Sequence, residues 1–164
     1  MMNPLQHAKV VWNTVSDLPI QQASAALAFV LVVAVVAVLM HEGAHWSVAR
    51  IFGVSGQFRI FARRGESRLW FLSVFAIKFR EEDVPALSHG QWRAVAAAGP
   101  FVDVSVALSC FTFGLDLPGP VWLTAGVALG GLLYFLSALM NSVPLPFLKN
   151  DGWVVVRPSV VYKD

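Results

Sequence analysis

Hydrophobic residues are concentrated in three long stretches of the chain, and polar residues are concentrated between them. The first stretch, residues 23–49, opens with a long apolar run that Ser24 alone interrupts. The second stretch covers residues 91–115 and the third residues 121–147, with a turn rich in Gly and Pro between them. An apolar stretch of about 20 residues matches the thickness of a bilayer when it is helical. The pattern predicts an integral membrane protein that is mainly α, with three transmembrane helices.

Residues 51–90, between the first two apolar stretches, follow a different pattern. Phe58 and Ile60 alternate with polar neighbours, and residues 69–79 are rich in aromatic and β-branched side chains. A polar segment around Gly65 separates the two runs. Alternation and β-branched content are typical of strands, and a short polar connection is typical of a turn. We therefore expect a β-hairpin between the first and second transmembrane helices.

Composition agrees with one membrane-embedded domain over residues 1–164. Hydrophobic residues make up 57% of the chain and charged residues 13%, and the mean hydropathy is +0.64. These values lie outside the range of ordinary soluble domains. Residues 1–22 are too polar to cross a bilayer, and residues 148–164 form a polar tail. The single cysteine, Cys110, excludes an internal disulfide within this sequence.

Cationic residues set the predicted orientation. Seven of them lie in the segment that ends at the start of the second span, and this excess predicts a cytoplasmic loop. The N-terminus is then outside and the C-terminus cytoplasmic, in a multi-pass protein of the cell membrane. Because these residues flank the membrane and form no basic stacking surface, we expect no nucleic-acid partner. The residues are Arg59, Arg63, Arg64, Arg68, Lys78, Arg80 and Arg93.

The pattern H-E-x-x-H occurs near the end of the first span, as His41-Glu42-Gly43-Ala44-His45. Residues four apart share one face of a helix, so His41 and His45 can bind one metal ion. This is the zinc-metalloprotease pattern, in which the glutamate acts as general base. Ionisable residues at membrane depth are costly and usually functional. The motif therefore predicts a zinc site near the cytoplasmic end of the first span, with Glu42 as its base.

Two histidines leave a catalytic zinc centre one protein ligand short, because three ligands and a water are usual. His7 belongs to the outer segment, and His89 precedes the second span, where we expect a helix-entry residue. Asp103 lies about ten residues into the second span. Asp151 follows the third span, where the chain returns to the cytoplasmic side. Topology therefore places Asp151 at the same side of the membrane as the histidine pair.

Three motifs together resemble the site-2 protease family of zinc intramembrane proteases. They are the H-E-x-x-H, the segment Ala97-Ala-Gly-Pro100, and Asn141-x-x-Pro144 followed by Asp151-Gly152. The resemblance covers about residues 24–155. It implies a three-helix core with a short membrane-associated β-hairpin region between the first two helices. No PDZ domain fits in the remaining residues, so we expect a minimal core.

Transferred residue by residue, the resemblance implies a role for each motif. It implies that His41, His45 and Asp151 are the zinc ligands and that Glu42 is the catalytic base. Asn141 would bind substrate or the developing oxyanion, as a neutral amide donor can.

Two features depart from the common family pattern. Asn141 and Asp151 are further apart than usual, and Asp103 stands where the family commonly has asparagine. Asp103 could be a protonated hydrogen-bond donor, the partner of an arginine or a substitute metal ligand. We group it with Asn141 as a substrate-binding candidate.

The expected function is zinc-dependent hydrolysis of peptide bonds in or near transmembrane segments, as in regulated intramembrane proteolysis. The expected partners are a membrane-protein substrate, the lipid bilayer and a second copy of the chain. One alternative is a non-catalytic zinc-binding membrane scaffold, although Glu42 argues against it because a structural metal needs no base. Two further alternatives are a protease of soluble or juxtamembrane loops and a small transporter or channel subunit.

Overall fold

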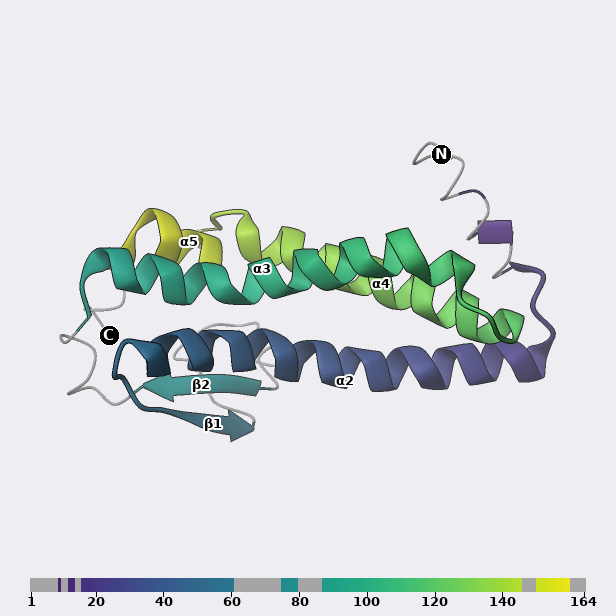
Figure 1. Cartoon of the computed structure of the whole chain (residues 1–164), viewed down its shortest axis with the longest axis horizontal. Coiled ribbons are helices and arrows are strands. Elements are labelled where there is room, and N and C mark those ends of the chain that lie inside the picture. The colour runs from purple at the N-terminus through teal and green to yellow at the C-terminus, as the bar shows by residue number, and fades with distance from the viewer. Residues whose placement is uncertain are drawn as a thin grey trace.

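Three long helices form the body of the molecule in this computed structural model (Figure 1). They are α2 (Ile20–Ile51), α3 (His89–Phe113) and α4 (Val121–Ser142). Each is long and apolar enough to cross a membrane, which confirms the three helices expected from the sequence. The structure describes residues 9, 12–13, 16–60, 75–79, 87–145 and 150–159, with the backbone alone for 57–60, 75–79 and 115.

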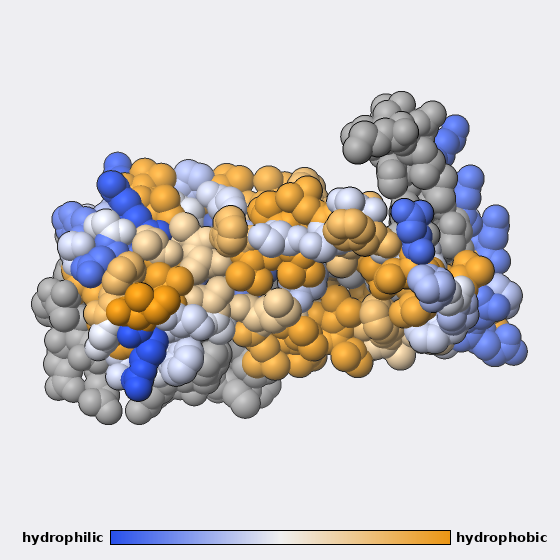
Figure 2. Space-filling model, viewed as in Figure 1, coloured by the Kyte–Doolittle hydropathy of each residue, from blue (hydrophilic) through white to orange (hydrophobic). Residues whose placement is uncertain are grey.

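The apolar side chains of the helices point largely outwards. Only 11% of the most hydrophobic window of α2 is buried inside the molecule, although this window has a mean hydropathy of 2.8. Figure 2 shows hydrophobic residues over the middle of the molecule and strongly hydrophilic residues towards its two ends. An apolar surface of this extent requires a bilayer as its solvent. The chain is therefore a multi-pass membrane protein.

Helix α2 extends beyond the predicted span of residues 23–49 at both ends. It begins directly after Pro19, and it ends where Gly53 adopts a φ of 85°. This left-handed conformation lets the amide of Gly53 donate to Arg50 and the amide of Val54 donate to Ala49. The longer helix carries the histidine pair on a regular backbone about 9–15 Å before its C-terminal end.

Helix α3 begins two residues earlier than predicted because Ser88 caps it. The Ser88 hydroxyl accepts from the amide of Gln91, and the Gln91 side chain accepts from the amide of Ser88. This reciprocal pair satisfies two amides at the start of the helix. The apolar stretch that Gly99 and Pro100 interrupt in the sequence is one continuous helix in the structure.

Helix α4 ends at Ser142, five residues before the predicted limit of the third span at residue 147. Val143 has extended backbone angles, φ −71° and ψ 123°. Pro144 accounts for this, because a proline disfavours the helical conformation in the residue before it. Within the predicted tail, a short helix α5 (Asp151–Val156) follows.

Two antiparallel strands, β1 (Gly56–Ile60) and β2 (Phe75–Phe79), lie beside the C-terminal half of α2 (Figure 1). Their register pairs Gly56 with Phe79 and Ile60 with Phe75. The connection between the strands lies outside the described residues. The membrane association of this β-hairpin region stays a prediction, as do the orientation of the chain and the cationic loop.

Small residues allow the helices to pack closely. A Cβ on Gly126 of α4 would lie 2.7 Å from the ring of Phe29 on α2, and one on Gly130 would lie 3.0 Å from Val33. Close approach of this kind is how transmembrane helices associate, since lipid supplies no hydrophobic drive between them. A turn of 3-10 helix, η3 (Gly114–Asp116), follows α3 in the connection to α4. It lies at the opposite end of the molecule from α5.

Candidate metal centre

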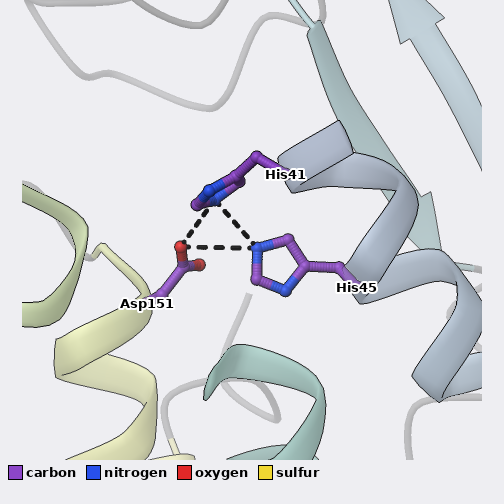
Figure 3. Close-up of side chains that lie close together, drawn as sticks. All are labelled: His41, His45 and Asp151. Atoms are coloured by element: carbon purple, nitrogen blue, oxygen red, sulfur yellow. Dashed lines mark hydrogen bonds and ion pairs between the residues drawn. The ribbon is translucent and has the colours of Figure 1, made fainter. Parts of the chain in front are cut away.

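Helices α2 and α5 bring three side chains together at one end of the bundle (Figure 3). His41 and His45 project from the same face of α2, and Asp151 is the first residue of α5. The Nε2 atoms of the two histidines are 3.1 Å apart. Asp151 Oδ2 lies 3.1 Å from Nε2 of His41 and 3.4 Å from Nε2 of His45. These three residues could hold a metal ion.

The outer ring nitrogens determine which atoms face the centre of this group. Nδ1 of His45 lies 2.6 Å from the carbonyl oxygen of Val95, which can only accept, so Nδ1 carries the proton. Nδ1 of His41 lies 2.8 Å from Oδ2 of Asp103. In the neutral form that binds metal, with each proton on Nδ1, both Nε2 atoms would point lone pairs at one another and at a carboxylate oxygen. A cation placed between these three atoms would be bound by all of them.

Asn150 places Asp151 at the centre by joining the end of α4 to the start of α5. Its side-chain nitrogen donates to the carbonyls of Met140 and Val143, each at 2.6 Å. Its side-chain oxygen accepts from the amides of Leu145 and Trp153, each at 3.2 Å. The buried amide group thus makes all four hydrogen bonds available to it. This arrangement fixes the N-terminus of α5 after the break that Pro144 causes.

Two glycines let the backbone approach this group closely. A Cβ on Gly99 of α3 would lie 2.5 Å from Nε2 of His45 and 2.6 Å from Nε2 of His41. A Cβ on Gly152 would overlap the carbonyl oxygen of Ser142 at the end of α4. Neither position tolerates a larger residue without movement of the site. Because Gly99 has no side chain, the backbone of α3 can lie directly against the two Nε2 atoms.

The electrostatic setting of Asp151 favours its charged form. Burial alone would raise the pKa of this carboxyl group. Its hydrogen bonds with His41 and His45, and their charges, outweigh burial and hold the pKa below its ordinary value. Asp151 therefore offers a carboxylate oxygen, which is a suitable ligand for a divalent cation.

Asp103 lies behind His41 and is completely buried. Its Oδ2 accepts from the hydroxyl of Ser137 at 2.6 Å as well as facing His41. Asn141, one turn further along α4, donates to the Ser137 hydroxyl at 3.4 Å. Both substrate-binding candidates thus belong to one hydrogen-bonded series that ends at His41.

The structure places the other predicted residues as follows. The longer separation between Asn141 and Asp151 does not keep Asp151 from the histidines. His89 is the exposed first residue of α3, and Glu42 follows His41 on α2. Sequence reasoning assigned no role to Asn150 and Ser137, although an Asn before a short helix is a capping signal. His7 lies outside the described residues.

No protein-family model, curated protein or solved structure matches the chain. The functional interpretation therefore rests on the residues and their geometry.

Proposed function

We propose that the chain is a zinc-dependent intramembrane endopeptidase that hydrolyses peptide bonds in or near transmembrane segments of membrane proteins. The observation that carries the proposal is the triangle of donor atoms from His41, His45 and Asp151 inside a multi-pass membrane protein. The resemblance to site-2 proteases names the same three residues as ligands. Geometry and motif thus agree on one donor set.

The spacing of the three donor atoms fits zinc. Zinc bonds to nitrogen and carboxylate oxygen are about 2.0–2.1 Å, so neighbouring ligands of a tetrahedral ion are roughly 3.3 Å apart. The edges of the donor triangle measure 3.1, 3.1 and 3.4 Å. Two imidazoles and one carboxylate leave the fourth position open, as in catalytic rather than structural zinc sites. Gly99 lets α3 approach both Nε2 atoms without a side chain between them, because a Cβ there would crowd both rings.

The chain supplies the remaining chemical groups of a zinc peptidase. His41, His45 and Asp151 would hold a zinc ion, which would supply a Lewis acid for a peptide carbonyl and a lowered pKa for a water molecule. Glu42, adjacent to His41, accepts the proton of the attacking water and delivers it to the leaving amine. Asn141, on the series that leads to His41, is the proposed amide donor to the developing oxyanion.

A transmembrane substrate must unwind before cleavage, because a helix occupies its own carbonyl groups. The two-stranded sheet beside α2 supports a way to hold an unwound segment. Among the described residues each strand pairs on one side only, and an extended peptide can add to such an edge. We place the site towards the cytoplasmic face, with the N-terminus outside, as the cationic loop predicts.

The test compares the wild type with Glu42→Gln in liposomes. Glu42→Gln keeps the size of the side chain and removes its basicity, so we expect bound zinc in both proteins. Cleavage of a model transmembrane substrate should occur in the wild type alone. Asp116→Asn, which removes an exposed carboxylate from the opposite end, is the matched control and should cleave normally.

The position of the cut, determined by mass spectrometry, separates the proposal from its alternatives. A cut inside the transmembrane segment supports intramembrane proteolysis. Cuts confined to soluble loops would instead identify a juxtamembrane protease. Zinc binding without cleavage of any of several substrates by the wild type would identify the non-catalytic scaffold.

A further inference from the structure

A carboxylate stands directly behind one proposed zinc ligand, on the side away from the donor triangle. Oδ2 of Asp103 on α3 lies 2.8 Å from Nδ1 of His41 on α2. The same oxygen accepts from the hydroxyl of Ser137 on α4 at 2.6 Å. One atom therefore connects all three membrane-spanning helices at the level of the site.

This placement is costly for the fold, which argues that it serves the site. Asp103 has no exposed surface, and its Oδ1 atom has no hydrogen-bond partner among the described residues. Buried carboxylates at membrane depth need compensation. Asp103 and Asp151 flank two imidazoles, so a divalent cation would bring the formal charge of these four side chains to zero. Ser137 alone cannot provide that compensation, because a hydroxyl carries no charge.

We infer that Asp103 is a positioning residue that fixes the tautomer and ring orientation of His41 and thereby strengthens metal binding. Its carboxylate accepts a hydrogen bond from Nδ1. This leaves Nε2, which faces His45 and Asp151, as the nitrogen that would bind the metal ion. Ser137 in turn fixes the carboxylate by donating to the same oxygen. His45 obtains the equivalent support from the Val95 carbonyl, so among the described residues Asp103 is the only charged group beside an Nδ1 atom of the two rings. This inference rests on the proposed zinc site and deepens it.

The test measures zinc affinity by competition with a chromophoric chelator, on the full chain in detergent micelles. Asp103→Asn keeps an oxygen that can accept from His41 and Ser137 and removes the charge. We expect zinc to bind about 10- to 100-fold more weakly, as for other supports of metal-bound histidines. Ser137→Ala should give a smaller loss, because the carboxylate remains. Asp116→Asn is the control for removal of any carboxylate and should bind zinc like the wild type.

A second measurement reads the tautomer directly and needs no variant. Nitrogen-15 NMR of zinc-loaded wild type, labelled at its four histidines, reports which ring nitrogen of His41 carries a proton. We expect a protonated Nδ1 with a proton resonance shifted downfield by the carboxylate, and loss of that shift in Asp103→Asn. A His41 ring without a proton on Nδ1 would overturn the inference even if the variant fails to fold.

The outcomes separate this inference from the proposed function. Equal zinc affinity of wild type and Asp103→Asn overturns the role of Asp103 and leaves the protease proposal intact. Weaker binding by Asp103→Asn, in a wild type that binds zinc without cleaving any substrate, supports the role of Asp103 and overturns the protease proposal. Absence of zinc binding by the wild type overturns both.

Discussion

Gly99→Ala offers the sharpest test of the metal centre, because one methyl group enters the space in front of both histidines. Its Cβ would lie 2.5 Å from Nε2 of His45 and 2.6 Å from Nε2 of His41. Ordinary contacts begin near 3.4 Å, so the atoms must separate by about 0.9 Å. Metal–ligand distances tolerate changes of only about 0.2 Å. The rings will move in preference to the helices, because a side chain rotates more easily than a packed helix shifts.

The expected loss follows from the cost of overpacking. An added methylene in a packed site costs about 1–3 kcal/mol. If the displaced rings must return to the crowded position to bind zinc, this cost opposes binding. Zinc affinity then falls by roughly 5- to 150-fold, since about 1.4 kcal/mol corresponds to a factor of ten. Chelator competition measures the affinity, and circular dichroism with thermal unfolding checks that the variant folds.

The matched control for Gly99→Ala is Gly43→Ala. Gly43 lies on α2 between the two histidines, and a Cβ there would meet no atom within 4 Å. This control also replaces a helical glycine by alanine, so it carries the same change in intrinsic helix propensity. We expect it to bind zinc like the wild type. A folded Gly99→Ala protein with wild-type affinity would refute the assignment of the centre to this space.

Three further variants address how the site is held. Gly152→Ala should abolish tight zinc binding, because its Cβ overlaps the backbone oxygen of Ser142 and displaces Asp151; chelator competition measures this. Asn150→Asp should weaken zinc binding about tenfold or more and lower the thermal stability, because it replaces a donor to two carbonyls by an acceptor. Ser88→Ala should cost about 1 kcal/mol of stability in denaturation and leave zinc affinity unchanged, because this cap lies outside the metal site.

The helices could be predicted because their signal is local and repeated. Each span has an apolar composition that only a bilayer accommodates, so three helices followed from the sequence alone. Their ends were less certain because they depend on single residues. Ser88 extends α3 backwards through a capping box, whereas Pro144 ends α4 before residue 147. Both signals were present in the sequence, but composition outweighed them in setting the predicted limits.

The histidine pair could also be predicted, because two residues four apart on a helix need no tertiary information. Asp151 was reachable through topology and motif. The role of Asp103 was not, because its alternatives differ in which side chains surround it. Only the structure shows that the neighbours are His41 and Ser137, each from a different helix.

The contacts that the sequence did not predict share one physical property, which is that they hold ligands in place rather than bind the ion. Asn150 fixes the position of Asp151 through four hydrogen bonds, and Asp103 and the Val95 carbonyl fix the outer nitrogens of the two rings. Such contacts connect residues far apart in sequence, so no periodic pattern reveals them. Their consequence is that the three donors already stand at metal-binding distances. Binding of the ion then costs little free energy for ordering the ligands. Removal of any of these supporting hydrogen bonds should reduce zinc affinity more than it reduces helix content.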